Sequence, residues 1–340
     1  MKEDILYKLL LLRTPKIGAV KYNELIKQFG SAKNAAESLK NTSVYDSVLR
    51  EIEQAEKLGI HFISDDDDFY PVNLKEIKNH PPVISVRGNL DTLLKDAVSI
   101  VGTRHATVAG MRLISEIAER FASNNYSVVS GMAIGSDSAA HMGALNAVGN
   151  GQTIAVLAGG VDYIWPLENE SLYHKIIDRG AIISEMPLGF IPKGQNFAQR
   201  NRWIAGIGEK LVLGEADLES GSMLTARFAL SYGRKLYAIP SHPLDSRAVG
   251  PNTLIKNGLA ELCMGADDFF YKEKKNDFEK IKEEKIKKDD SLLDKIGTIP
   301  VSESVLAEVV KKSVAEIKSE LVVLELQGLI RKQDGGYVRL

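Results

Sequence analysis

The feature that most constrains this chain is an alternation of short β-rich runs with helical segments between residues 96 and 270. Strands that alternate with helices are joined by crossovers, which make neighbouring strands parallel and place helices on the faces of the sheet. We therefore expect an α/β fold built on an extended Rossmann-like, doubly wound sheet. The six expected strands are residues 97–102, 126–131, 152–159, 181–186, 209–216 and 235–240.

A small helical domain is expected before this segment, in residues 1–62, where Gly18 and Gly30 interrupt the helical pattern. Its stretch GAVKYNELIKQFG predicts a SAM-like or helix-hairpin-helix-like domain. Such a hairpin can offer backbone N–H groups to phosphates, but plain packing also explains it. The acidic run Asp65–Asp68 predicts a solvated loop that leads into the Rossmann-like domain, residues 63–270.

The C-terminal part of the chain is expected to divide into a charged linker and a last domain. Residues 271–290 hold eight lysines and seven acidic residues with few apolar ones, which predicts a solvated tether. In residues 291–340, three amphipathic helical segments precede a Gly-Gly turn between two short strands, and this order predicts a winged helix. Its third helix carries Glu316, Glu320 and Glu325, which repel phosphate, so a structural or protein-contact role competes with DNA binding.

Glycine and small polar residues follow three of the expected strands. Because the carboxyl ends of parallel strands meet along one edge of a sheet, where helices begin, their loops can present N–H groups to an anion. The triplet RNR at 200–202 adds cations. The sequence therefore predicts a phosphate-binding site made of several loops. Its candidate residues are Gly102, Thr103, Arg104, Ser130, Gly131, Gly135, Arg200, Asn201, Arg202, Gly221, Ser222 and Thr225.

Arg200 and Arg202 are expected to act differently. Two residues at this spacing point roughly 200° apart on a regular helix, so we expect one arginine to contact the ligand and the other to pair with a carboxylate. Trp203 is the best candidate for stacking on a base, although a core tryptophan is the commoner case. Aromatic residues make up only 7% of the chain, so we expect phosphate contacts to outweigh base stacking.

Searches for enzyme motifs find nothing complete. The sequence lacks the GxxxxGK[ST] phosphate loop, the GxGxxG dinucleotide fingerprint, the GxSxG hydrolase elbow and the HExxH zinc motif. Cys263 is the only cysteine, which excludes a multi-cysteine zinc site. His141 suits an acid or base, but a packed or capping histidine is commoner. Asp137 and Glu185 are the best carboxylates near strand ends, and each also suits a helix cap or a counter-charge for arginine. We therefore expect no catalytic residue, metal or cofactor.

The charge of the whole chain gives no sign of a nucleic-acid partner, because 43 Lys and Arg residues face 45 Asp and Glu residues. Any basic surface must therefore be local. The start of the chain places Glu3 and Asp4 where a signal peptide needs basic residues. No apolar run reaches the ~18 residues that cross a bilayer. We expect a soluble, cytoplasmic protein that does not insert into a membrane.

A set of ordered motifs resembles the DprA (Smf) DNA-processing family. In chain order they read VGTR, VSGMAIGSDSAAH, TIAVLAGGVD, SEMPLG, FAQRNRWIAG, ESGSMLTARFAL, GRKLYAIP and GPNTLIKNG. The resemblance covers about residues 60–262 continuously and both flanks more loosely. It implies a Rossmann domain that binds single-stranded DNA, a homodimer formed through that domain, and delivery of RecA in natural transformation and recombination.

The DNA pocket of the family is basic, and the resemblance implies that the matching positions of this chain bind DNA. Members of the family often end in a winged helix. Some motifs depart from the family: GSD stands for GID, RNRWIAGIGEK for RNRIIAGLS, and IPSHP replaces VPG. These departures lie beside the pocket. The matching positions are Arg104, Ser130, Gly131, Arg200, Arg202, Gly221, Ser222 and Thr225.

Two other functions compete with this one. Phosphoribohydrolases share a Rossmann-like fold, but they carry PGGxGTxxE where this chain reads ESGSMLTARFA, without the glycine pair and the glutamate. A transcription regulator would sense a small ligand in the central domain and place the winged helix on duplex DNA. The acidic third helix of that last domain argues against the regulator.

Overall fold

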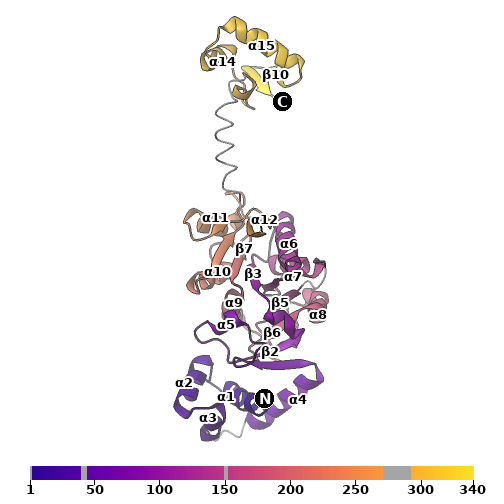
Figure 1. Ribbon diagram of the computed structural model, residues 1–340, viewed down its shortest axis with the longest axis vertical. Helices are drawn as coiled ribbons and strands as arrows, with labels where there is room; N and C mark the ends of the chain where they lie inside the picture. Colours follow the sequence, from indigo (N-terminus) through magenta and orange to yellow (C-terminus); the bar gives the residue numbers. More distant parts are fainter. Residues whose placement is uncertain (1, 40–43, 149–151, 271–291) are drawn as a thin grey trace. The chain divides into compact units, whose positions relative to one another are not determined.

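The computed structural model describes residues 2–39, 44–148, 152–270 and 292–340 (Figure 1). The chain forms two compact units, Met1–Phe270 and Tyr271–Leu340. The predicted charged linker, 271–290, lies outside the described residues.

Four helices open the first unit, as the helical pattern predicted. Gly30 ends the second helix at φ 80°, and its N–H donates to the carbonyl oxygen of Ile26 at 2.8 Å. This left-handed conformation suits glycine because a Cβ would be strained there. The four helices are α1 (Lys2–Arg13), α2 (Ala19–Phe29), α3 (Ala32–Leu39) and α4 (Tyr45–Lys57).

A mixed sheet forms the centre of this unit, with strand order β1-β2-β6-β5-β4-β3-β7-β8-β9 in the described residues. The strands from β3 to β9 are parallel, whereas β2 pairs antiparallel with β6 and with β1. The strands are β1 (Ile60–Ser64), β2 (Val83–Gly88), β3 (Ala97–Val101), β4 (Ser127–Ser130), β5 (Gln152–Val156), β6 (Ala181–Ser184), β7 (Lys210–Leu213), β8 (Lys235–Ala238) and β9 (Glu261–Leu262).

The six predicted strands are confirmed as β3 to β8, but the sequence analysis missed three others. β1 and β2 precede the alternation of strands and helices, so the pattern that revealed the others does not include them. β9 has two residues, which is too short for any periodicity to show. The predicted domain boundary at residue 62 falls inside β1.

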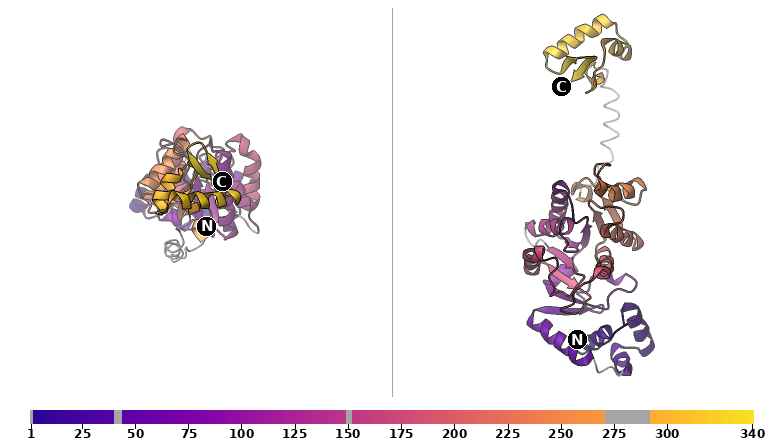
Figure 2. Two further views of the ribbon diagram at one scale, coloured as in Figure 1. Left: turned by 90° about the horizontal axis from the view of Figure 1, so that it is seen from above. Right: turned by 180° about the vertical axis from the view of Figure 1, so that it is seen from behind.

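Helices cover both faces of the sheet, as a doubly wound fold requires. Val98 and Ile100 of β3 pack on the side of α6 and α7, and the alternate residues Ala97 and Val101 pack on the side of α9 and α10. Figures 1 and 2 show these two groups on opposite sides of the strands. The helices are α5 (Val72–Lys75), α6 (Val108–Ser123), α7 (Ser136–Asn146), α8 (Glu170–Arg179), α9 (Gly194–Ile207), α10 (Gly221–Ser231), α11 (Val249–Lys256) and α12 (Asp267–Phe270), with 3-10 turns at Leu90–Leu94, Leu167–Asn169 and Ser246–Ala248.

The sheet reverses its winding direction at β3. The chain proceeds from β3 through β4 and β5 to β6 on one side, and then returns to place β7 on the other side of β3. The helices that follow β3 and β7, α6 and α10, therefore cover opposite faces of the sheet. Such a switch point opens a crevice at the carboxyl ends of the strands.

The acidic run after β1 forms the predicted loop and also contacts α1. Lys8 of α1 is only 4% exposed, and its ammonium group lies 2.5 Å from Asp66 and 3.5 Å from Asp65. A buried ammonium requires a counter-charge. Two of the four carboxylates therefore join α1 to the sheet, while the run itself remains a loop in which Asp66 and Asp68 are exposed, as predicted.

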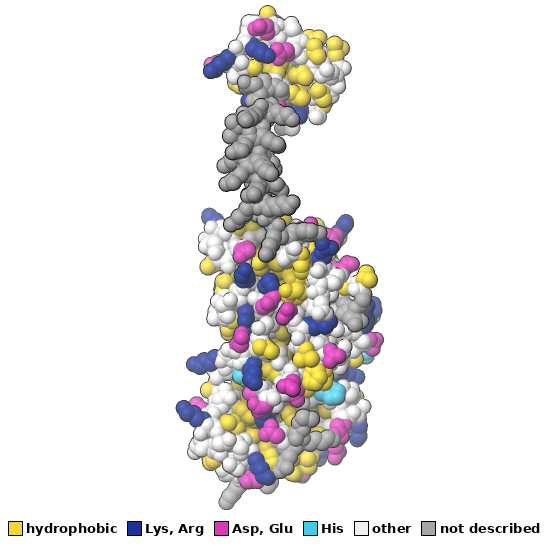
Figure 3. Space-filling view, viewed as in Figure 1, with side chains coloured by type: hydrophobic (Ala, Val, Ile, Leu, Met, Phe, Trp, Pro, Cys, Tyr) yellow, Lys and Arg dark blue, Asp and Glu magenta, His cyan; other side chains and the backbone are white. Residues whose placement is uncertain are grey.

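The second unit is a small winged helix whose described elements follow the predicted order. Its first predicted helix is only a 3-10 turn, and Glu316 and Glu320 of the third segment bond within the unit to Ser313 and Lys312. Hydrophobic side chains gather on part of its surface (Figure 3). The elements are a 3-10 turn (Leu292–Lys295), α14 (Glu303–Val310), α15 (Val314–Leu326), β10 (Ile330–Gln333) and β11 (Gly336–Arg339).

No helix in the described parts of the chain is long and apolar enough to cross a membrane.

Candidate nucleic-acid interface

Three loops that the sequence analysis singled out lie side by side at the switch point. They follow β3, β4 and β7 and lead into α6, α7 and α10. The Ser222 hydroxyl donates to the Gly102 carbonyl oxygen at 2.6 Å, and the Ser136 N–H donates to the Thr103 carbonyl oxygen at 3.2 Å. The Thr103 N–H in turn donates to the Glu215 carbonyl oxygen at 2.6 Å. These hydrogen bonds hold the three loops together as one surface.

Glu215, which the sequence analysis did not single out, fixes the start of α6. Its buried carboxylate accepts hydrogen bonds from the N–H group and the hydroxyl of Thr107, at 2.7 and 2.6 Å. Thr107 is the N-cap of α6. A buried carboxylate needs such donors, because water cannot reach it. The pattern of small residues at strand ends gave no signal for this position.

Gly135 is required by the packing between two loops. It has φ +81°, and a Cβ there would lie 2.6 Å from the Arg104 carbonyl oxygen and 2.7 Å from that of Thr103. Any other residue would force these loops apart. The glycine therefore serves close backbone contact beneath the surface.

Arg200 lies behind the loops. Its side chain is buried, with the residue 6% exposed, and its guanidinium donates to the carbonyl oxygens of Gly131 and, at 2.6 Å, Val156. A Cβ on Gly131 would collide with this guanidinium. Burial lowers the pKa of Arg200 to about 10, and the charge of Asp137 opposes this shift. Arg200 thus joins the ends of β4 and β5.

Asp137 serves Arg200 as a counter-charge. It is also buried; burial raises the pKa of its carboxyl, and the charge of Arg200 works in the opposite direction. The carboxylate accepts a hydrogen bond from the Ala133 N–H at 3.3 Å. Of the alternatives for Asp137, the influence of the Arg200 charge on its pKa favours neutralising an arginine.

Two of the candidate hydroxyls are also committed to the fold. The Ser130 hydroxyl donates to the Ile100 carbonyl oxygen at 2.7 Å, and the Thr225 hydroxyl donates to the Gly221 carbonyl oxygen at 3.0 Å. Both residues are at most 1% exposed. They can position the loops, but their side chains do not reach the surface.

Arg104 forms the exposed rim of the site. Its guanidinium lies 5.3 Å from the centre of the Trp165 ring and 5.9 Å from that of Phe197. The two rings are 4.5 Å apart and inclined at 53°. The Asn201 amide lies on α9 and donates to the Gly221 carbonyl oxygen at 3.1 Å, which ties α9 to α10. The rim therefore combines a cation with two aromatic rings.

The sequence analysis did not identify these two rings. Phe197 precedes Arg200 by three residues on α9, so helical spacing offered a signal for it. Trp165 lies in the long connection between β5 and α8, where no periodicity applies. Only the tertiary structure brings Trp165 to Arg104.

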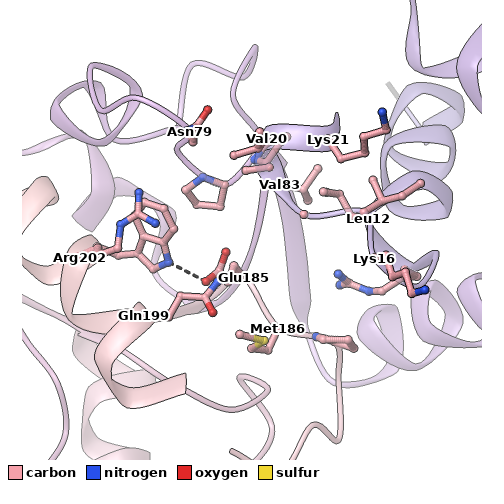
Figure 4. Close-up of a pocket in the computed structure, with 18 of the residues that line it drawn as sticks. Leu12, Lys16, Val20, Lys21, Asn79, Val83, Glu185, Met186, Gln199 and Arg202 are labelled. Atoms are coloured by element: carbon pink, nitrogen blue, oxygen red, sulfur yellow. Dashed lines mark hydrogen bonds between the residues drawn. The ribbon is translucent and has the colours of Figure 1, made fainter. Parts of the chain in front are cut away.

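Arg202 faces a different place, a cavity of about 540 Å³ between the α1–α2 hairpin and the sheet (Figure 4). Its guanidinium lies 4.8 Å from the centre of the Trp203 ring. Lys16 lines the opposite wall, and Glu185 and Gln199 line the same side as Arg202. Arg200 and Arg202 thus leave α9 on different sides, as their helical spacing predicted.

Trp203 belongs to the core, as the commoner alternative predicted. It is 4% exposed, and its indole N–H donates to the Glu185 carboxylate at 2.8 Å. Burial raises the pKa of Glu185, and the hydrogen bond from Trp203 acts against this shift. Base stacking on Trp203 is therefore excluded by its burial.

His141 is a packed histidine. It is fully buried, and its Nδ1 lies 2.7 Å from the Thr153 hydroxyl oxygen. Burial lowers the pKa of its imidazole to about 3. The ring is thus neutral near pH 7 and does not reach the surface of the loops.

The chain matches three known families in order along its length. Residues 61–274 match the family called DNA recombination-mediator protein A. Residues 2–52 match the DprA-like N-terminal HHH domain, and residues 280–336 match the DprA winged helix domain. The order of these matches is the order of the three predicted folded domains.

Similarity to individual proteins agrees with these matches. Protein Smf of Escherichia coli is 34% identical over 298 residues, which are 82% of this chain and 77% of that protein. Protein Smf of Synechocystis is 37% identical over 211 residues, which are 61% of this chain, and the match spans about half, 52%, of the relative's length.

Two solved structures are similar to this one. DNA processing protein A of Streptococcus pneumoniae has a TM-score of 0.62 at 30% identity and covers 78% of this chain and 92% of its own. DNA processing protein A of Helicobacter pylori, described for its single-stranded DNA binding mode, has a TM-score of 0.57 at 28% identity. The latter match covers 62% of this chain and 93% of the other.

Proposed function

Since this chain belongs to the DprA/Smf family of DNA recombination mediators, we propose that it binds single-stranded DNA at the switch point and loads RecA onto the strand. The observation that carries this proposal is the position of Arg104. An exposed guanidinium beside two aromatic rings, on a surface of joined loops, suits a flexible strand that offers both phosphates and unstacked bases.

Main-chain groups at the start of α10 support the same proposal. The N–H groups of Gly221 and Ser222 lie in the first turn of a helix of 11 residues, where no earlier carbonyl group of the helix can accept them. They have no hydrogen-bond partner in the parts of the chain that the structure describes. A phosphate placed there would receive both hydrogen bonds and the favourable helix dipole.

We assign the predicted residues to two groups. The first group touches the strand, by side chain or by N–H: Gly102, Thr103, Arg104, Asn201, Arg202, Gly221 and Ser222. The second group is beneath the loops and positions the first: Ser130, Gly131, Gly135, Arg200 and Thr225.

Arg202 extends the proposed path of the strand. It lies two residues beyond Arg200 on α9, and its cavity reaches the α1–α2 hairpin at Lys16. Both cations suit phosphates that leave the switch point. The hairpin thus becomes the far end of the site, a role that its sequence left open beside plain packing.

We infer that the strand is bound without chemical change. We also infer that the protein forms a homodimer through its Rossmann-like domains and acts in natural transformation and recombination. The resemblance to the family supports these parts of the proposal.

Incubation with labelled strands and nucleotides tests the absence of chemistry, since a phosphoribohydrolase would release free base. Light scattering tests the dimer, and RecA-dependent strand exchange on strands coated with a single-strand-binding protein tests loading.

Fluorescence anisotropy with unlabelled competitors tests the DNA site directly. We expect single strands to compete better than duplex, and Arg104→Ala to weaken binding about tenfold, since one stacked or ion-paired contact contributes ~1–3 kcal/mol. Arg112→Ala is the matched control, because Arg112 is an exposed arginine on α6 that pairs with Glu116. Equal competition by duplex, or equal effects of the two substitutions, would contradict the proposal.

A further inference from the structure

A second groove runs along the free edge of the sheet, away from the proposed DNA site. β1 is the last strand in the sheet order, and its neighbour in the described structure is β2 alone. All of Ile60–Ser64 line this groove, which has a volume of about 780 Å³. Its apolar lining residues from other elements are Ile5, Ile52, Ala55, Phe69 and Leu90.

The outer edge of β1 presents unused main-chain groups. The Asp65 N–H donates to the Pro82 carbonyl oxygen at 3.0 Å and continues the antiparallel ladder between β1 and β2. Successive residues in such a ladder turn alternately toward and away from the partner strand. The N–H and C=O groups of His61 and Ile63 therefore point to β2, whereas those of Ile60 and Phe62 point to the groove. Within the described residues, the N–H and C=O groups of those two have no other main-chain partner.

The rim of the groove is acidic. Five carboxylates line it, and no lysine or arginine does so among the described residues. Lys8 lies behind the rim and neutralises part of this charge through Asp4 and Asp66. Asp67 and Asp68 add further negative charge next to an apolar floor. The five residues are Asp4, Glu56, Asp66, Asp67 and Asp68.

We propose that this groove binds an extended segment of a partner protein that alternates apolar residues with lysine or arginine, and that the segment adds a strand beside β1. Its N–H and C=O groups would pair with Ile60 and Phe62, its apolar side chains would face the floor, and its cations would face the carboxylates. Free strand edges bind other strands readily, so the main-chain part of this recognition needs no rearrangement.

Other occupants fit less well. A second copy that pairs β1 with β1 would bring two sets of the same five carboxylates together, which is unfavourable. The chain's own residues 271–290 carry seven acidic residues against eight lysines, so their attraction to an acidic rim is small.

The first test uses a labelled nonapeptide of alternating valine and lysine, with an alternating valine and glutamate peptide as its counterpart. We expect the full chain to bind the first peptide and not the second, with an affinity that falls as salt rises. The pair Glu56→Lys and Asp68→Lys should weaken binding about tenfold or more, since reversed rim charges repel the peptide. The pair Glu53→Lys and Asp178→Lys makes the same charge change at exposed positions outside the groove and should leave affinity within about twofold.

Amide hydrogen exchange tests the strand pairing itself. Bound peptide should slow exchange at Ile60 and Phe62 and leave His61 and Ile63, already paired with β2, unchanged. Unchanged exchange at the first two would overturn the proposal, as would equal effects of the two charge-reversal pairs. Tighter binding of a peptide with the sequence of residues 271–290 would overturn it in favour of the chain's own segment. A homodimer that Glu56→Lys and Asp68→Lys dissociate, and that the control pair leaves intact, would overturn it in favour of a second copy.

Discussion

The buried layer beneath the switch-point loops and the exposed rim above them hold arginines in opposite situations. Arg200 is 6% exposed and donates to main-chain carbonyl oxygens of two strand ends, with Asp137 as its counter-charge. Arg104 is exposed and lies over the rings of Trp165 and Phe197. The first arginine stabilises the shape of the loops, and the second is available to a ligand. A motif rich in glycine, serine and arginine thus combines residues that position the loops with residues that are available to a ligand.

This comparison predicts that substitutions in the two regions change different quantities. Changes in the buried layer should lower the free energy of unfolding, and DNA binding should fall as a consequence. Changes on the rim should lower DNA affinity and leave the free energy of unfolding nearly constant. The following predictions run from the largest effect to the smallest.

Arg200→Ala should have the largest effect. It leaves two buried carbonyl groups without their charged donor, which costs about 1–3 kcal/mol for each in the free energy of unfolding, and it removes the positive charge that favours the buried Asp137 carboxylate. Urea denaturation measures this loss, with Arg112→Ala as the control that should change stability by less than about 0.5 kcal/mol. Loss of DNA binding with normal stability would instead make Arg200 a contact residue and remove the distinction between the regions.

His141→Gln should change the pH dependence of stability. The imidazole has a pKa of about 3 when folded and an ordinary value of 6.5, so the unfolded chain binds the proton first as pH falls. Its stabilising contribution is therefore complete above about pH 6.5 and declines toward pH 3, by about 2 kcal/mol between pH 7 and pH 5.

Subtracting the variant's free energies of unfolding from those of the original chain gives the contribution of His141 to stability at each pH. The subtraction matters because His80 has the opposite shift: its partner Asp65 raises its pKa, and that contribution is lost as pH rises. Parallel pH profiles of the two proteins would show that His141 is not buried in the neutral form.

Trp165→Leu tests the rim. It removes one of the rings beside Arg104 and should weaken binding of single strands by about 1–2 kcal/mol, within the range that base stacking contributes. The free energy of unfolding should fall much less than in Arg200→Ala. Unchanged affinity would exclude the aromatic pair from the interface.

Arg202→Ala should have the smallest effect, about twofold to threefold in affinity, because one exposed phosphate contact at the far end of the strand contributes little. The effect should appear with long strands and vanish with strands too short to reach the α1–α2 hairpin. Equal losses with short and long strands would place Arg202 at the switch point itself.

Much of the fold followed from the sequence because the strands from β3 to β8 alternate with helices, and that alternation determines parallel pairing. β1 and β2 escaped detection because they form an antiparallel edge outside the alternation. The ion pairs of Lys8 with Asp65 and Asp66 could not be predicted either, because nearly 60 residues separate the partners.

The candidate site was predictable in part for a similar reason. Strand order brings the loops at Gly102, Gly131 and Gly221 together, so local residue types sufficed to identify them. Helical spacing showed that Arg200 and Arg202 point apart, but it contains no information on which side is buried. Trp165 lies in the long connection between β5 and α8. Its position beside Arg104 could not be predicted, because no local sequence pattern determines the path of this connection.

The central claim is that the rim, and not the buried layer, contacts the strand, and the salt dependence of single-strand affinity tests it most directly. The logarithm of affinity should fall with the logarithm of salt concentration, with a slope near 0.7 for each phosphate neutralised. We predict that Arg104→Ala lowers this slope by about 0.7, whereas Arg200→Lys weakens binding and leaves the slope unchanged. A slope that is unchanged in Arg104→Ala and reduced in Arg200→Lys would contradict the account.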